Sequence, residues 1–202
     1  MMGPIYVITD PHASLPVIEQ ARAAAQGGAA LVQIRDKDIS DFEFTALVKS
    51  LLPEMVAYGV QLIVNDRVDV AIATGAHGLH IGQGDGDVAT IRQIMPRGMI
   101  LGLSIETDAQ AHRIPAGVDY IGAGPIRATA TKPDHARPIG FEGLAQITAT
   151  TRLPTYAIGG LGHGDAAAIK AAGAVGMAVV SAVTRAPDPI AATRALVNEW
   201  TL

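Results

Sequence analysis

The sequence predicts a single-domain (β/α)8 TIM barrel over residues 1–202, and three observations support this fold class. Eight short apolar segments alternate with eight segments of helical pattern. The short segments are apolar on both faces, which is typical of buried parallel strands. Strands that alternate with helices indicate right-handed βαβ units, and eight units in 202 residues lie at the short end of the barrel range. A doubly wound open sheet is the alternative, because the pattern alone does not require closure.

The predicted strands are short runs rich in Val, Ile and Leu. Glycine, proline or charged residues follow most of them, and these residue types interrupt strands. In chain order the strands are expected at residues 5–9, 30–34, 60–64, 78–81, 99–103, 118–121, 154–158 and 175–180.

The predicted helices are rich in alanine or amphipathic, and several end at a clear stop signal. Gly27 and Gly28 follow the first helix, Gly59 the second and Gly173 the seventh. Glycine just past a helix is a common C-terminal cap, so these positions mark the helix ends. In chain order the helices are expected at residues 15–26, 42–58, 68–73, 88–95, 108–112, 141–149, 164–172 and 187–200.

Composition excludes several classes of function. The hydrophobic content of 49% suits one domain with a large core, and the net charge of −4 with no basic run makes nucleic acid an unexpected partner. The chain has no cysteine, so it forms no disulfide and no thiolate metal site. No signal peptide is visible, and no apolar run approaches the roughly 18 residues of a membrane span. We therefore expect no membrane association and a cytoplasmic location. A homo-oligomer is compatible with the sequence.

Distinctive residues follow nearly every predicted strand. In a parallel barrel these positions share one rim, where barrel enzymes place their active sites. The rim residues are Gln33, Arg35, Lys37, Asn65, Asp66, Asp85, Ser104, Thr129, Thr131, Lys132, Gly159, Gly160, Val180 and Ser181.

Asp66 and Asp85 follow the third and fourth predicted strands. Either one alone is as well explained as a helix N-cap. As a pair on neighbouring strands they suit Mg²⁺, which usually takes one or two carboxylates, water and phosphate oxygens. Arg35, Lys37 and Lys132 would add positive charge around the same phosphates.

A second anion site is expected after the last two strands. Gly159 and Gly160 end the seventh strand, and Val180 and Ser181 end the eighth. Loops after these strands commonly bind phosphate in barrels, although the glycines could equally serve a tight turn. His80, in the fourth strand, is interpreted as packed or bonded to backbone rather than catalytic, and no nucleophile–base pair is evident.

The chain resembles the thiamine-phosphate synthase family over almost its whole length. The matching segments, none of them specific alone, have the order and spacing of the family. They are YVITD at 6–10, VQIRDK at 32–37, VNDRVDVA at 64–71, HIGQ at 80–83, GAGP at 122–125 with TATK at 129–132, AIGG at 157–160 and AVVSA at 178–182.

The resemblance implies a Mg²⁺-dependent transferase that joins hydroxymethylpyrimidine diphosphate to hydroxyethylthiazole phosphate and releases diphosphate. It also implies that diphosphate leaves first and that the thiazole nitrogen attacks the resulting pyrimidine carbocation. By resemblance, Gln33 holds the pyrimidine, and Arg35, Lys37, Asn65 and Lys132 hold the diphosphate. Asp66 and Asp85 bind Mg²⁺. Ser104, near the reacting centre, and Lys132 are the expected catalytic residues. Thr129, Thr131, Gly160, Val180 and Ser181 surround the thiazole phosphate.

Two alternatives carry a different function on the same fold. A related thiazole tautomerase places a histidine where this chain has Pro125, and it lacks the metal-site pattern of residues 82–85. A non-catalytic phosphate-binding barrel would not need Asp85 or Lys132, and both are present. The chain departs from the family's usual pattern at Ile105, Glu106 and Arg127, positions that bear on affinity for the thiazole.

The segment 123–139 is expected to be a mobile lid. It is long, shows no clear periodicity and carries Thr129, Thr131 and Lys132. Loops of this length in a compact domain are usually functional or disordered.

Overall fold

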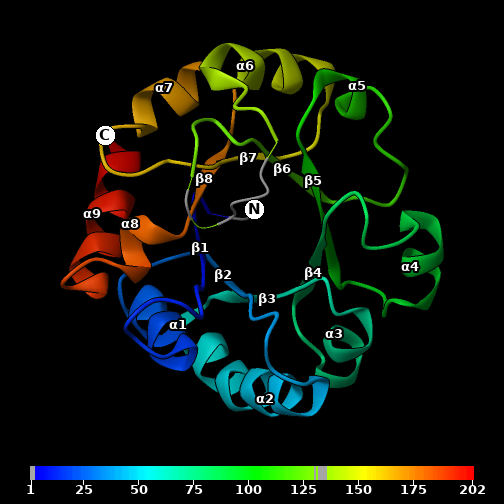
Figure 1. The fold of residues 1–202 in the computed structure, drawn as a ribbon, viewed down its shortest axis with the longest axis vertical. Coiled ribbons are helices and arrows are strands. Elements are labelled where there is room, and N and C mark those ends of the chain that lie inside the picture. Colours follow the sequence, from blue (N-terminus) through cyan, green and yellow to red (C-terminus); the bar gives the residue numbers. More distant parts are fainter. Residues whose placement is uncertain (1–2, 130, 132–135) are drawn as a thin grey trace.

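The computed structural model describes residues 3–129, 131 and 136–202. Eight parallel strands, β1 to β8, pair in chain order and close into a barrel (Figure 1). Closure is made by β1 and β8, in a register that sets Val7 opposite Val179. The (β/α)8 barrel is thus confirmed, and the open sheet is ruled out.

Each strand lies within two residues of its expected bounds. The strands are β1 (Ile5–Ile8), β2 (Leu31–Ile34), β3 (Gln61–Asn65), β4 (Gly78–Ile81), β5 (Ile100–Ile105), β6 (Tyr120–Ala123), β7 (Thr155–Ile158) and β8 (Gly176–Val179).

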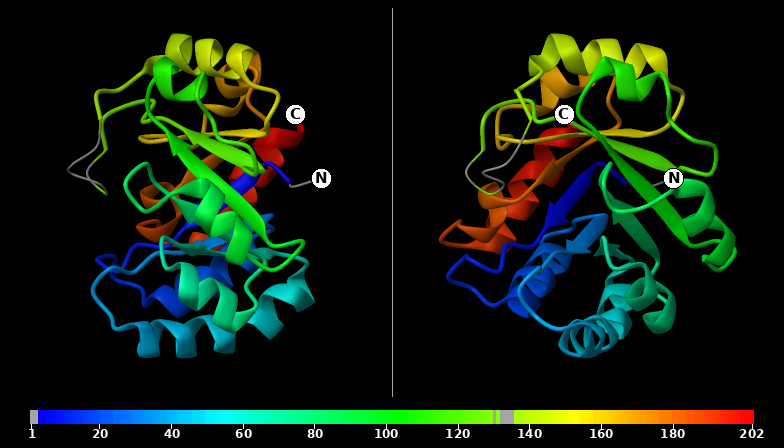
Figure 2. Two further views of the ribbon diagram at one scale, coloured as in Figure 1. Left: turned by 90° about the vertical axis from the view of Figure 1, so that its right-hand side faces the viewer. Right: turned by 45° about the vertical axis from the view of Figure 1, so that its right-hand side comes forward.

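Helices surround the strands as an outer layer (Figure 2). They are α1 (Val17–Gln26), α2 (Asp41–Tyr58), α3 (Val68–Thr74), α4 (Val88–Ile94), α5 (Asp108–Ala111), α6 (Gly140–Thr150), α7 (Ala166–Ala171), α8 (Ser181–Thr184) and α9 (Pro189–Thr201). The sequence pattern missed α8, because a four-residue helix is too short to show a helical period.

The bounds of α2 follow from its end residues. Ser40 and Glu43 form a capping box at its start, in which each side chain bonds the other residue's backbone N–H. Gly59 ends the helix in the left-handed conformation, with φ of 70°. Glycine adopts this conformation without steric cost, which explains why the helix stops there.

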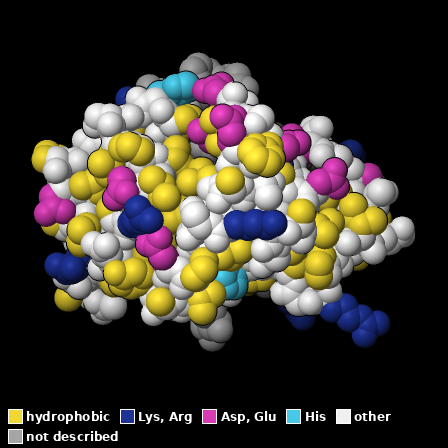
Figure 3. Space-filling model, turned by 90° about the horizontal axis from the view of Figure 1, so that it is seen from below, with side chains coloured by type: hydrophobic (Ala, Val, Ile, Leu, Met, Phe, Trp, Pro, Cys, Tyr) yellow, Lys and Arg dark blue, Asp and Glu magenta, His cyan; other side chains and the backbone are white. Residues whose placement is uncertain are grey.

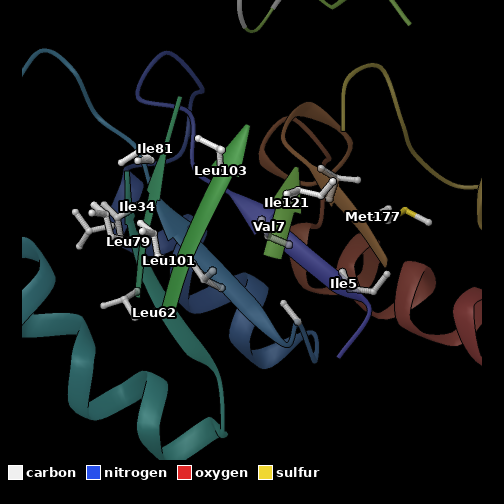
Figure 4. Packing of buried hydrophobic residues seen from close by; sticks show 14 of the residues in the cluster. Ile5, Val7, Ile34, Leu62, Leu79, Ile81, Leu101, Leu103, Ile121 and Met177 are labelled. Carbon is white, nitrogen blue, oxygen red and sulfur yellow. The ribbon is translucent and has the colours of Figure 1, made fainter. Parts of the chain in front are cut away.

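Both faces of the strands are buried, which is why the sequence shows no polar alternation. In β1, Ile5 and Val7 belong to the larger apolar cluster, which lies between strands and helices and is shown in part in Figure 4. Tyr6 and Ile8 belong to a second cluster that fills the barrel interior. Successive residues of a strand point to opposite faces. Alternate residues of one strand therefore pack in the barrel interior and between the strands and the helices.

The surface shows no large area of a single charge on the face seen in Figure 3, where acidic, basic and apolar side chains are interspersed. Among the described helices, none combines the length and apolar character needed to cross a membrane.

Candidate active site

A pocket of about 190 Å³ opens where the strands end at their carboxyl termini. It is lined by Gln33, Arg35, Lys37, Asn65, Asp66, Asp85, Ser104, Thr129, Thr131, Gly159, Gly160, Val180 and Ser181. These are the rim residues that the sequence singled out, apart from Lys132. Lys132 lies outside the described residues, as do residues 130 and 133–135 of the expected lid. The binding roles of the lining residues stay predictions.

Asp66 and Asp85 do not cap helices. The residue before α3 is Arg67, and α4 is capped by Asp87, whose carboxylate accepts from the Thr90 N–H. The Asp66 carboxylate lies 3.2 Å from the Lys37 ammonium, and the Asp85 carboxylate accepts from the Gly82 N–H at 2.7 Å. The N-cap interpretation is therefore wrong for both aspartates, and both residues line the pocket.

The backbone at Asp66 is unusual. Its φ is 53°, and it is the non-glycine residue with positive φ within the described part of the chain. Residues held in this region cost free energy and cluster at functional sites. A hydrogen bond of 2.9 Å from its N–H to the His80 carbonyl helps to hold the conformation.

Asp66 and Asp85 offer carboxylate oxygens, the type of ligand that Mg²⁺ takes in proteins. Within the described ranges, no group of three or more His, Cys, Asp and Glu side chains is placed to hold an ion. A cation between Asp66 and Asp85 would complete its shell with water and phosphate oxygens, which is the coordination that Mg²⁺ usually adopts.

The opposite side of the pocket carries hydroxyls and glycines. The Thr129 and Thr131 hydroxyls lie 2.8 Å apart after β6. Gly159 and Gly160 have φ of 97° and 65°, and a Cβ added at Gly160 would lie 2.8 Å from the Arg127 Cβ. The tight-turn explanation of these glycines is therefore correct, and it does not exclude phosphate binding.

Arg127 ties two loops of the rim together. Its guanidinium donates to both carboxylate oxygens of Asp165, at 2.9 and 2.7 Å, and to the Gly160 carbonyl at 3.0 Å. It also lies over the Phe141 ring. The bond to Arg127 lowers the pKa of Asp165. Arg127 thus links the segment after β6 to the segment after β7. This link is a structural reason for a charged residue at a position where the family's usual pattern differs.

The pocket floor holds His80, which is half-buried and packs against the Tyr120 ring, as one of its two sequence interpretations predicted. One ring nitrogen of His80, Nδ1, lies 2.9 Å from the Tyr120 hydroxyl, and the other, Nε2, lies 3.0 Å from the Ser104 hydroxyl. His80 is therefore bonded to side chains and not to backbone through its ring, because β4 and β5 bring it beside Ser104. Burial lowers the pKa of His80 to about 4, against an opposing effect of Asp85, so the ring is neutral at pH 7.

Several other residues that line the pocket were not predicted from the sequence. Tyr6 and Tyr156 line the pocket from the barrel interior, and Asp10 and Glu106 line it at the rim. Asp10 is paired with Arg185 at 3.0 Å. For the tyrosines, the sequence did contain a signal, because each lies inside an otherwise apolar strand. A buried tyrosine hydroxyl usually has a hydrogen-bond partner, so such a residue indicates a polar group inside the barrel.

Fold and pocket define a class of protein: a (β/α)8 barrel whose rim gathers carboxylates, cations and hydroxyls around a site suited to phosphorylated ligands. A family model described as thiamine monophosphate synthase matches residues 5–183. The chain belongs to that family.

Individual relatives agree with this assignment. A thiamine-phosphate synthase of Roseiflexus sp. (strain RS-1) is 48% identical over 197 residues, covering 96% of this chain and 84% of the relative. One from Roseiflexus castenholzii is 46% identical over 197 residues, covering 96% and 86%. The solved thiamine phosphate pyrophosphorylase from Pyrococcus furiosus superposes with a TM-score of 0.90 at 35% identity, covering 98% of this chain and 95% of that one.

Proposed function

We propose that the protein is a thiamine-phosphate synthase that condenses hydroxymethylpyrimidine diphosphate with hydroxyethylthiazole phosphate. The products are thiamine phosphate and diphosphate. The observation that carries the proposal is the composition of the pocket: in a member of this family, residues that suit two phosphorylated ligands line one pocket.

One arc of the rim suits the diphosphate. Arg35, Lys37 and Asn65 offer positive charge and an amide donor, and Asp66 and Asp85 would hold Mg²⁺. The metal, when bound, would supply countercharge to the leaving diphosphate. Lys132 is proposed to add a further positive charge.

The other arc suits the monophosphate. Thr129, Thr131 and Ser181 offer hydroxyls, and Gly160 allows a close approach to the backbone. The ends of β2 to β4 and the ends of β6 to β8 lie across the closed barrel from each other. The two substrates would then enter with their phosphates apart and their reacting atoms together, near Ser104.

The floor suits a dissociative reaction. Loss of diphosphate leaves a positive charge on the pyrimidine, so the site needs orientation and screening from water more than a strong nucleophile. Gln33 is proposed to orient the pyrimidine from its buried place in β2. Neutral His80 adds no positive charge that would oppose the cation.

The test is an assay of the purified protein with both substrates and Mg²⁺, followed by measurement of thiamine phosphate. Reactions that omit one substrate or contain EDTA should give none. Lys37→Ala should weaken use of the pyrimidine diphosphate, whereas Lys49→Ala, on an exposed position of α2, should not. Failure of the wild type to form thiamine phosphate would refute the proposal.

A further inference from the structure

A continuous chain of hydrogen bonds crosses the pocket floor from Gln33 to Ser104. The Gln33 amide donates to the Tyr6 hydroxyl at 2.5 Å, and the Tyr6 and Tyr120 hydroxyls lie 2.9 Å apart. His80 then joins Tyr120 to Ser104. These five residues come from five strands, so only the closed barrel brings them together.

We propose that this chain is a polarity relay, in which the orientation of the Gln33 amide sets whether Ser104 offers the substrate a hydrogen or a lone pair. Tyr6, Tyr120 and His80 are then positioning residues that act through Gln33 and Ser104. The inference rests on the proposed function, in which Gln33 orients the pyrimidine and the reacting atoms lie near Ser104.

The direction of the relay follows from counting protons. Each hydroxyl and a neutral imidazole carry one proton to donate. Because Gln33 donates to Tyr6, Tyr6 donates to Tyr120, and Tyr120 donates to Nδ1 of His80. The His80 proton is then on Nε2 and is donated to Ser104. The hydroxyl hydrogen of Ser104 is left for a ligand in the pocket.

Turning the amide over reverses every bond. The Gln33 oxygen would accept from Tyr6, the His80 proton would move to Nδ1, and Ser104 would donate to Nε2. Only lone pairs of Ser104 would then face the ligand. Mixed arrangements leave a buried polar group without a partner, which is costly because Tyr6 and Tyr120 are 2% and 0% exposed.

The relay would couple recognition of the ring to the reacting centre. The pocket-facing part of the Gln33 amide presents one order of donor and acceptor in each orientation. A pyrimidine edge that matches the first orientation would obtain a hydrogen bond from Ser104. An analogue with donor and acceptor exchanged would select the second orientation and lose that bond. Discrimination would thus appear in turnover as well as in binding.

The first test measures the His80 tautomer by nitrogen NMR in the ligand-free protein, so it does not depend on activity. Wild type should carry the proton on Nε2. Gln33→Met, which removes the amide far from His80, should give a mixture of tautomers, and Gln33→Glu, when ionised, should favour Nδ1. Tyr156→Phe is the matched control, because the Tyr156 hydroxyl bonds the Gly3 carbonyl and no member of the relay.

An unchanged tautomer ratio in Gln33→Met, with the fold verified by circular dichroism, would overturn the relay. If this variant does not fold, Tyr6→Phe replaces it, because Tyr6 also has no direct bond to His80 and reaches it only through Tyr120. The same ratio in Tyr6→Phe as in wild type would overturn the relay equally.

The second test asks whether Tyr120 acts through Ser104. Tyr120→Phe should lower kcat roughly tenfold, the effect of one hydrogen bond. In a Ser104→Ala background the same change should have little effect, since the end of the relay is gone. Fully additive losses would refute action through Ser104. A wild type inactive on both substrates would refute the proposed function, and the NMR measurement would still decide the relay.

Discussion

The prediction of a Mg²⁺ site rests on two residues, Asp66 and Asp85. Asp66→Asn and Asp85→Asn keep the side-chain shape but remove the charge, so each should lower turnover by about 100-fold or more if the carboxylates hold the metal. Steady-state rates across a Mg²⁺ titration measure the effect.

Asp87→Asn is the matched control, because Asp87 caps α4 two residues beyond Asp85. An asparagine also caps a helix, so both stability and Mg²⁺ response should stay close to wild type. Full turnover in EDTA, or in either metal-site variant, would contradict the metal assignment.

The sequence predicted the rim residues but not the floor residues, and the difference is physical. Asp66 and Asp85 stand out because a charge after an apolar run ends a strand. Tyr6 and His80 lie inside such runs. From the sequence alone, a residue at these positions cannot be told apart from an ordinary residue of the hydrophobic core. Their partners are set by which strands face each other across the barrel, and this depends on tertiary structure alone.

The loops after β6 and β7 are elements that Arg127 holds together. Arg127→Met keeps most of the apolar side chain but removes the bonds to Asp165 and Gly160. Because the Arg127 side chain is 49% exposed, the stability loss at neutral pH should be small, about 1 kcal/mol or less. The Michaelis constant for the thiazole phosphate should rise several-fold, because the Gly160 carbonyl loses the hydrogen bond from Arg127.

The same contact predicts a pH dependence with a defined sign. The pKa of Asp165 is lowered in the folded state, chiefly by Arg127. The stabilisation is therefore present above the ordinary aspartate pKa and is lost as the pH falls through the lower, folded-state pKa. Denaturant unfolding should therefore show a larger difference between wild type and Arg127→Met at neutral pH than near pH 3, where part of the stabilisation is already lost. A difference of equal size at both pH values would contradict the ion-pair explanation.

At the scale of the whole molecule, closure of the barrel is what would keep the two proposed anion sites apart. The alternation of strands and helices in the sequence predicted eight βα units. Closure of the barrel could not be predicted in the same way, because it depends on the pairing of β1 with β8, which no local sequence pattern specifies. Closure matters for function because it sets the arc of Asp66 and Lys37 across the rim from the arc of Thr129 and Gly160. Two arcs with different chemistry should respond to different substitutions.

Gly160→Ala tests this separation. With φ of 65° the added methyl is strained, and it would lie 2.8 Å from the Arg127 Cβ and 3.0 Å from the Ala128 carbonyl oxygen. We expect a higher Michaelis constant for the thiazole phosphate and an unchanged one for the pyrimidine diphosphate, because only one arc is disturbed.

Gly75→Ala controls for the backbone strain. Gly75 has φ of 68° and nothing within 4 Å of an added Cβ, so its substitution carries a similar conformational cost without a clash. It should lower the melting temperature and leave both Michaelis constants unchanged. If Gly160→Ala changed only the constant for the pyrimidine diphosphate, the arc after β7 would belong to the other substrate. Equal changes in both constants would show instead that the two arcs form one continuous site.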